Sequence, residues 1–248
     1  MKQQTTIHKT VLTVSNLMVR RGPFTLRIPR LELAAGRVAC VVGANGSGKT
    51  TLLEVIMGLL TATKGVVEIS GRPLTTIATH PYLKRFTGFL PDDEAWIIPE
   101  LTADEYVSLL SVAYRRAGVE HDPGEEARSL AKSLDFNAID QQLGSLSHGN
   151  RRKIQLITAM MHRPRFLVVD ELRNGLDPIA IRQAEDLLRI YQAKGGAILA
   201  ATHDLWWAER FADDIIMIKN GRVILQATTT AIVAEAGSVE AKFMELYK

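Results

Sequence analysis

Blocks of apolar residues separated by turn-forming residues predict an alternation of strands and helices along this chain. Short apolar runs indicate buried strands, whereas apolar residues three and four positions apart indicate amphipathic helices. Strands are expected at residues 38–42, 66–70, 86–90, 166–169 and 197–201, helices at 47–60, 178–194 and 205–211, and a hairpin through Asn220 and Gly221 joining 215–219 to 222–226. This order is typical of an α/β domain with a mostly parallel sheet, to which we add antiparallel β elements in the N-terminal part.

The middle of the chain has a different pattern. From about residue 101 to 161 the sequence has helical periodicity and no convincing strand. Thr102 and Glu105 fit a capping box at the start of the first helix, and further helices are expected at 124–134 and 150–161. We therefore expect one domain, residues 1–248, in which an all-helical subdomain (about 92–163) interrupts a core made of about 1–91 and 164–248.

Composition excludes several classes of protein. The 248 residues are 46% hydrophobic and 23% charged, as in an ordinary globular protein, and a net charge of +3 is too weak to indicate a nucleic-acid binder. The single cysteine, Cys40, can form neither an internal disulfide nor a multi-cysteine metal site, and its apolar surroundings predict a buried strand residue. No window approaches 18 consecutive apolar residues, so any membrane role is expected to come through a partner.

The sharpest chemical signal is the segment GANGSGKT at residues 43–50. It fits the pattern G-x-x-x-x-G-K-[ST] and lies between a predicted strand and a predicted helix. Such a loop turns backbone N–H groups toward phosphate oxygens, and the helix N-terminus adds positive charge. Lys49 can reach the β- and γ-phosphates, and the Thr50 hydroxyl can ligate Mg²⁺. The expected nucleotide-binding residues are Gly43, Ala44, Asn45, Gly46, Ser47, Gly48, Lys49, Thr50 and Thr51.

Two acidic residues, Asp170 and Glu171, end the apolar strand predicted at 166–169. We expect this strand to neighbour the strand of the phosphate loop, which would bring both carboxylates to the nucleotide. Asp170 would then hold the hydration shell of Mg²⁺, and Glu171 would polarise the attacking water. Many strands end in Asp, so the pattern gains its meaning from the phosphate loop upstream.

A Ser–Gly turn opens the helix predicted at 150–161. Ser147, His148, Gly149 and Asn150 form this turn, which can present a hydroxyl, backbone N–H groups and a helix dipole to an anion. The alternative is a plain helix cap by Ser147. The basic triplet that follows, at 151–153, is expected to be a solvated helix face rather than a nucleic-acid patch.

These features in this order, with the isolated His203 after the last core strand, resemble the ATP-binding cassette (ABC) ATPase family over about residues 12–247. The resemblance implies a P-loop NTPase core, with ATP and Mg²⁺ as ligands and Glu171 and His203 as catalytic residues. In this family two copies meet head to tail around two ATP molecules. The Ser147–Gly149 turn of one copy would therefore bind the γ-phosphate held by the other copy, and Asp177 would link the two sites.

The sequence departs from the family pattern at several positions. Asp92 stands where glutamine is usual, and as a hard oxygen ligand it can still contact Mg²⁺. His148, Asn150, Arg173 and Asn174 also replace the usual residues. Family members usually have an aromatic residue that stacks on adenine, and Phe24 is the candidate here. Alternatively, the guanidinium of a neighbouring arginine stacks on adenine, or Phe24 is simply a core residue.

The resemblance implies the ATP-hydrolysing subunit of a membrane transporter of export type, to which the tail at 237–247 and the run at 91–93 are also similar. The implied partners are transmembrane subunits and a second cassette, identical or homologous. The protein would lie in the cytoplasm, peripheral on the cytoplasmic face of the cell membrane. Residues after Asp92, including the apolar cluster Trp96, Ile97 and Ile98, are candidates for the contact.

Two alternatives remain from the sequence. One is a soluble cassette ATPase that acts on ribosomes or DNA, although no second cassette or coiled coil is evident. The other is a degenerate cassette that binds nucleotide as a scaffold and barely turns over, which Asp92 and the altered Ser–Gly turn motivate.

Overall fold

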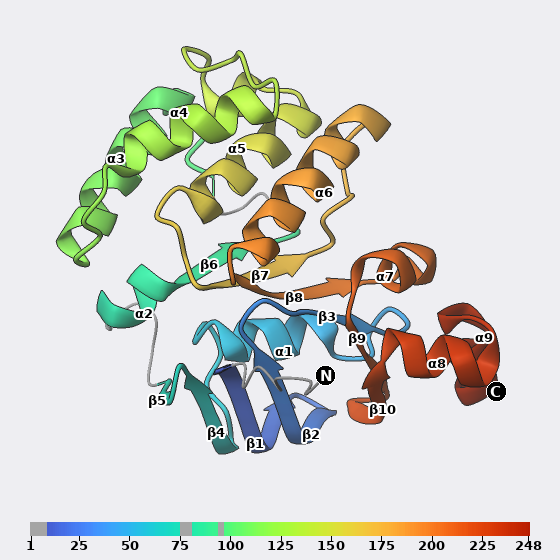
Figure 1. The fold of residues 1–248 in the computed structure, drawn as a ribbon. Coiled ribbons are helices and arrows are strands. Elements are labelled where there is room, and N and C mark those ends of the chain that lie inside the picture. Colours follow the sequence, from blue (N-terminus) through green and yellow to red (C-terminus); the bar gives the residue numbers. More distant parts are fainter. Residues whose placement is uncertain (1–8, 75–80, 94–96) are drawn as a thin grey trace, which may run out of the picture.

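A mixed ten-stranded sheet organises the described part of the computed structural model, which is residues 9–74, 81–93 and 97–248 (Figure 1). Its strands are β1 (Thr10–Arg21), β2 (Phe24–Ala34), β3 (Val38–Val42), β4 (Lys64–Ile69), β5 (Arg72–Pro73), β6 (Thr87–Leu90), β7 (Phe166–Asp170), β8 (Ala197–Thr202), β9 (Asp214–Lys219) and β10 (Arg222–Thr228). Across the sheet they follow the order β5-β4-β1-β2-β10-β9-β3-β8-β7-β6. The expected α/β class with antiparallel strands in the N-terminal part is confirmed.

The parallel part of the sheet is β9, β3, β8, β7 and β6. All five residues of β3 are buried, as expected for a strand covered on both faces. Val38, Cys40 and Val42 point into one core cluster, whereas Ala39 and Val41 point into the other. Cys40 is thus the buried strand residue that its surroundings predicted.

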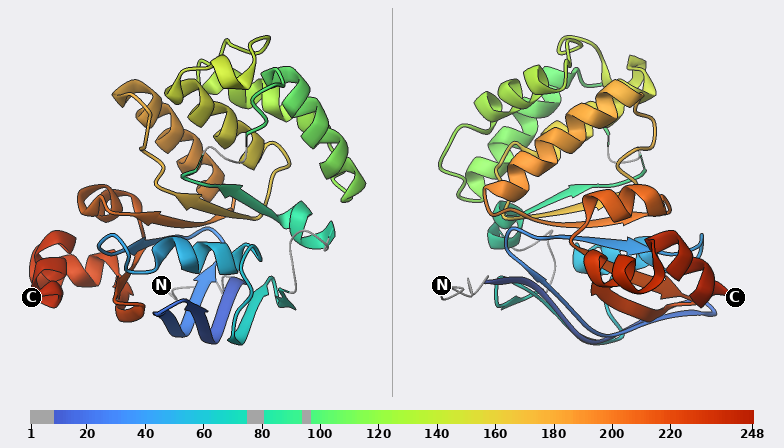
Figure 2. Two further views of the ribbon diagram at one scale, coloured as in Figure 1. Left: turned by 180° about the vertical axis from the view of Figure 1, so that it is seen from behind. Right: turned by 45° about the vertical axis from the view of Figure 1, so that its right-hand side comes forward.

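Helix α1 (Lys49–Ile56) lies between these parallel strands and the antiparallel strands β1, β2 and β4 (Figure 2). It is shorter at both ends than the predicted 47–60. Gly48 has a φ of 111°, which is not helical, and Gly58 has a φ of 66°, a left-handed conformation that ends the helix. The strand predicted at 86–90 also begins later than expected, because Phe86 is the last residue of α2 (Pro81–Phe86).

Four helices cover the opposite face of the parallel strands (Figure 1): α3 (Ala103–Arg116), α4 (Pro123–Ser133), α5 (His148–Met160) and α6 (Pro178–Ala193). The capping box is confirmed, since the Glu105 N–H donates to Thr102 Oγ1 (3.2 Å) and the Thr102 N–H donates to Glu105 Oε2 (2.8 Å). Between β6 and β7 the described residues contain α3, α4, α5 and a short 3₁₀ turn (Leu143–Ser145), with no strand, whereas α6 follows β7.

The C-terminal part adds α7 (Leu205–Phe211), α8 (Thr229–Ala236) and α9 (Val239–Tyr247) beside β9 and β10. The hairpin is confirmed: Asn220 (φ 49°) and Gly221 (φ 72°) are both left-handed, as a two-residue hairpin turn requires. Among the helices of the described residues, none combines the length and apolar character needed to cross a membrane.

Candidate functional site

The loop from Gly43 to Gly48 joins β3 to α1 and is shaped by its glycines. A side chain at Gly43 would place a Cβ 2.4 Å from the carbonyl oxygen of Ile218, so only glycine fits there. Gly46 (φ 77°) and Gly48 (φ 111°) supply left-handed backbone. Lys49 folds back over the loop and donates to the carbonyl oxygen of Gly43 (2.8 Å). The loop therefore places an ammonium group and the start of a helix where a phosphate can bind.

Asp170 ends β7, and its carboxylate reaches the start of α1. The expectation that β7 is the neighbour of β3 is wrong, because β8 lies between them. The contact nevertheless forms, since Thr50 Oγ1 donates to Asp170 Oδ2 (3.1 Å). Burial, together with the nearby carboxylates of Asp92 and Glu171, raises the pKa of Asp170 to about 6 against the opposing effects of Thr50 and Lys49. Concentrated negative charge of this kind favours a bound cation.

Glu171 follows Asp170 in a left-handed backbone conformation, with a φ of 49°. For a residue other than glycine this conformation is uncommon and persists where the surroundings hold it. Its carboxylate accepts from Thr202 Oγ1 (3.1 Å) and lies 3.0 Å from His203 Nδ1. Thr202, the last residue of β8, and His203, which follows it, thus fix the orientation of a carboxylate that lines the cavity beside the loop.

Arg152 holds the backbone of this acidic pair. It lies on α5 and is 2% exposed, so the expected solvated face at 151–153 is wrong for its central residue. Its guanidinium donates to the carbonyl oxygens of Asp170 and Glu171, the second at 2.8 Å, and to that of Pro91. An arginine is tolerated in this position because backbone carbonyls accept from both of its Nη groups. Sequence periodicity gave no signal for this role.

A cavity of about 540 Å³ joins the loop to the carboxylates, a size typical of ligand sites. Its walls are Arg21, Phe24, Asn45, Gly46, Gly48, Lys49, Thr50, Thr51, Asp92, Asp170 and Glu171. Gly43, Ala44 and Ser47 shape the loop without lining the cavity. His203 also lies outside the lining and reaches the site through Glu171.

Asp92 and Asn174, two departures from the family pattern, interact with each other. Asn174 Nδ2 donates to Asp92 Oδ1 (2.8 Å), and Asp92 lines the same cavity as Asp170. Arg173, a third departure, forms an ion pair with Asp204. The altered residues therefore form their own contacts, and they leave Asp92 at the cavity wall.

The Ser–Gly turn lies outside this cavity. Ser147 caps α5, since its Oγ accepts from the Asn150 N–H (3.2 Å). A Cβ at Gly175 (φ 76°) would lie 2.6 Å from Cε1 of His148, so this glycine makes room for the imidazole. Asp177 caps α6 by accepting from two backbone N–H groups, and these bonds lower its pKa. Within one chain, neither Ser147 nor Asp177 lines the cavity beside the phosphate loop.

Phe24 lies at the start of β2 and lines the cavity, but it also packs against the core. A Cβ at Gly48 would be only 2.8 Å from Phe24 Cζ, so the ring packs directly against the phosphate loop. Both the adenine-stacking and the packing interpretation are compatible with this position.

Tyr247, on α9, contacts the loop from the other end of the chain. Its hydroxyl accepts from the Ala44 N–H (3.3 Å), although the two residues are 203 positions apart, and it donates to the carbonyl oxygen of Ile218. The Phe243 ring stacks on the Tyr247 ring (3.9 Å between centroids). Sequence reasoning missed this contact, for which no local pattern exists.

The residues present fit Mg²⁺ together with a nucleotide. Mg²⁺ is usually held by one or two carboxylates, substrate phosphates and water rather than by an all-protein cage. Thr50, Asp170 and Asp92 offer such oxygen ligands at the cavity, and no group of three or more His, Cys, Asp or Glu side chains forms a closed metal site in the part of the chain described.

Comparison with known proteins agrees with this geometry. Residues 26–174 match the family described as "ABC transporter". The chain is 29% identical to the ABC-type transporter ATP-binding protein EcsA of Bacillus subtilis (strain 168), covering 92% of this chain and 90% of EcsA. It is 33% identical to the Nod factor export ATP-binding protein I of Burkholderia orbicola (strain AU 1054), covering 82% of this chain and 65% of that protein.

Some relatives are longer, and the chain spans 63% of one of them. A solved structure of an ATP-binding subunit of an ABC transporter superposes with a TM-score of 0.87 at 27% identity, covering 96% of this chain and all (100%) of that one. The family match spans both the phosphate loop and Asp170 and Glu171 at the end of β7, and the fold superposes on that of an ABC transporter subunit. The chain belongs to the ABC transporter family, as a cassette that binds and hydrolyses ATP.

Proposed function

We propose that this cassette energises export through separate transmembrane subunits, by pairing with a second cassette around two ATP molecules. The observation that carries the dimer is the division of the site. The phosphate loop and Glu171 line one cavity, whereas Ser147 and Gly149 lie outside it. A second copy, identical or homologous, can bring its own turn over the γ-phosphate.

In the proposed reaction, water attacks the γ-phosphorus, Glu171 accepts its proton, and ADP and phosphate are the products. Lys49 and the loop N–H groups bind the phosphates, while Thr202 and His203 hold the Glu171 carboxylate in one orientation. When bound, Mg²⁺ neutralises charge on the β- and γ-phosphates. Each group needed for turnover has a place, which argues against a degenerate scaffold.

A membrane partner is supported by a second cavity of about 300 Å³ between core and helical layer, bounded by Met57, Leu59, Phe89, Pro91, Tyr106 and Leu110 among others. Leu59 beside it is 43% exposed. Because Arg152 bonds both Pro91 and the end of β7, a partner helix seated here would press on the catalytic backbone. Ile97 is buried and Ile98 is exposed, and Trp96 lies outside the described residues.

Export is supported by the Nod factor export protein among the relatives. The transmembrane partners would place the cassette on the cytoplasmic face of the membrane, with membrane contact only through them. The small net charge of +3 gives no support to a ribosome or DNA substrate.

The dimer is tested by Ser147→Asp in a Glu171→Gln background. Aspartate keeps the helix cap but adds a negative charge opposite the partner's γ-phosphate. The Glu171→Gln protein should dimerise with Mg-ATP in light scattering, and Ser147→Asp should abolish this. Ser238→Asp, at the equivalent cap of α9, is the matched control and should dimerise normally. Dimers that survive Ser147→Asp, or that never form, would contradict the proposal.

The membrane contact is tested by Leu110→Glu, which places a charge in the second cavity. Val112→Glu is the control, because Val112 lies on the same helix but does not line this cavity. Leu110→Glu should release the protein from the membrane fraction while its ATP-dependent dimerisation remains. Equal retention of both variants on membranes would place the partner elsewhere.

A further inference from the structure

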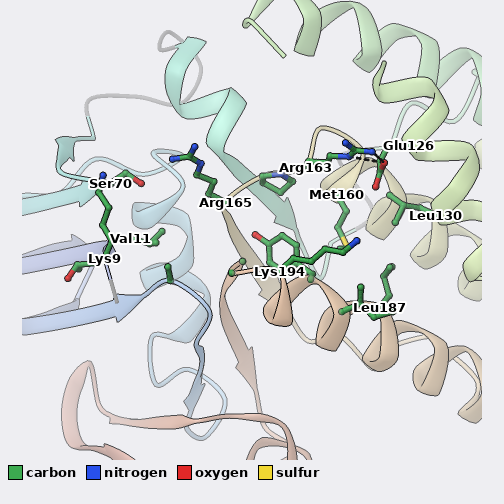
Figure 3. Close-up of a pocket in the computed structure, with 17 residues that line it drawn as sticks. Lys9, Val11, Ser70, Glu126, Leu130, Met160, Arg163, Arg165, Leu187 and Lys194 are labelled. Carbon is green, nitrogen blue, oxygen red and sulfur yellow. Dashed lines mark hydrogen bonds and ion pairs between the residues drawn. The ribbon is translucent and has the colours of Figure 1, made fainter. Parts of the chain in front are cut away.

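Figure 3 shows a third cavity, of about 430 Å³. It lies at the ends of the parallel strands opposite to those that carry the candidate nucleotide site. Arg165 and Gly196, which line it, come directly before β7 and β8, whereas Asp170 and Thr202 end these strands. Its walls come from the start of β1, from α4, from the end of α5 and from the end of α6. The cavity therefore lies between the helical layer and the core, and it is separate from both the ATP site and the second cavity beside Tyr106.

The charged side chains of this cavity are mostly basic. Lys9, Arg163, Arg165 and Lys194 line it, with Glu126 as the acidic member. Glu126 is engaged by Arg163, whose Nη2 lies 2.6 Å from Glu126 Oε2 (Figure 3). Within residues 9–74, 81–93 and 97–248, Lys9, Arg165 and Lys194 form no ion pair with an acid. The cavity thus carries an excess of positive charge that an anion would neutralise.

A buried hydroxyl group also lines this cavity without a partner. The Tyr191 oxygen is shielded from solvent and makes no hydrogen bond. Gly196 lets the ring take this position, because a Cβ there would lie 2.4 Å from Tyr191 Cε1. Burial raises the pKa of Tyr191, so the group stays a donor. Leaving such a donor unsatisfied costs free energy, which a ligand oxygen would recover.

The remaining wall is apolar. Val11, Leu130 and Met160 are buried, and Leu187 is half-buried beside them. Figure 3 shows Leu130, Met160 and Leu187 on the same side of the cavity as the basic ends of Arg163 and Lys194, with Val11 on the other side. The Arg165 guanidinium points away from them, over the Phe86 ring (5.0 Å to its centroid). A ligand that suits both parts has a charged head and a short hydrocarbon body.

We propose that this cavity binds a small amphipathic phosphomonoester, whose phosphate pairs with the basic side chains and accepts from Tyr191, and whose apolar part covers Val11, Leu130 and Met160. The cavity volume lies within the usual range for small-molecule sites. A ligand here would contact α4 and α6 at once, and so would tie the helical layer to the core.

The test is calorimetric titration of the protein with n-octyl phosphate. Saturating Mg²⁺ and a non-hydrolysable ATP analogue keep the phosphate loop occupied, so that the probe reports on the other cavity. One molecule should bind per chain. Loss of a hydrogen bond to a charged group predicts about tenfold weaker binding for Tyr191→Phe, and a similar loss for Lys194→Gln. Lys64→Gln, an exposed lysine on β4, should bind the probe as the wild type does.

Thermal unfolding without the probe serves as the folding control. Tyr191→Phe removes an unsatisfied hydroxyl, so its melting temperature should equal or exceed that of the wild type. The proposal fails if no saturable binding occurs, or if both substitutions leave the affinity unchanged. Equal affinity for the uncharged octyl glucoside would overturn the phosphate assignment, and binding to phosphatidylglycerol vesicles alone would replace the small molecule by a lipid surface.

Discussion

Arg152→Lys is the substitution that most directly tests how the catalytic backbone is held. Arg152 is 2% exposed, and its guanidinium donates hydrogen bonds to the carbonyl oxygens of Pro91, Asp170 and Glu171. A lysine ammonium keeps the charge but is a compact donor without the planar fork, so it can serve only part of this set. Losing two charge-assisted hydrogen bonds at about 1.5 kcal/mol each predicts a loss of roughly 3 kcal/mol in the free energy of unfolding.

Activity should fall as well, because the left-handed backbone of Glu171 depends on this clamp. Urea denaturation followed by circular dichroism gives the stability, and phosphate release gives kcat. Arg30→Lys is the matched control: Arg30 is exposed and pairs with Glu32 at the surface, where such pairs contribute at most about 1 kcal/mol. If Arg152→Lys lowers the free energy of unfolding no more than the control does, and kcat is unchanged, Arg152 does not hold the catalytic backbone.

Two further substitutions test separate parts of the molecule. Tyr247→Phe removes the acceptor of the Ala44 N–H, and one hydrogen bond of about 1 kcal/mol predicts a rise of about fivefold in KM for ATP with little change in kcat. Steady-state kinetics over a range of ATP concentrations decide this, and an unchanged KM would mean that α9 does not support the loop. Burial lowers the pKa of His162 to about 4, against about 6.5 in an unfolded chain. The unfolded state therefore binds the extra proton first, and the wild type should lose roughly 3 kcal/mol between pH 7 and pH 4 from this group alone. His162→Phe, which keeps a ring against Tyr114, should lose correspondingly less in urea titrations at the two pH values, and parallel losses would exclude His162 as the cause.

Structural features that depend only on residues close together in the sequence could be predicted from it. The phosphate loop is one, because its glycines, Lys49 and Thr50 act at fixed short spacings along one turn. The apolar run of β3, the capping box at Thr102 and the hairpin at Asn220 are others, since each depends on neighbours within a few positions. Helix ends were less predictable, because left-handed glycines and not apolar spacing set the limits of α1.

Features that depend on contacts between distant segments could not be predicted. The position of β8 between β3 and β7 follows from the packing of the whole sheet. The burial of Arg152 follows from three carbonyl groups on two other segments, so a basic residue that reads as solvated is in fact enclosed. Tyr247 reaches Ala44 only because the C-terminal helices fold back beside β9.

The central claim, that Glu171 is the general base of an ATPase whose loop holds the triphosphate, is tested by comparing wild type and Glu171→Gln for ATP binding and for phosphate release in the same preparation. Loss of a general base predicts a fall in kcat of about 10²–10⁴-fold. ATP affinity should stay near that of the wild type, because Lys49 and the loop are untouched. Phosphate release by Glu171→Gln close to the wild-type rate would contradict the account.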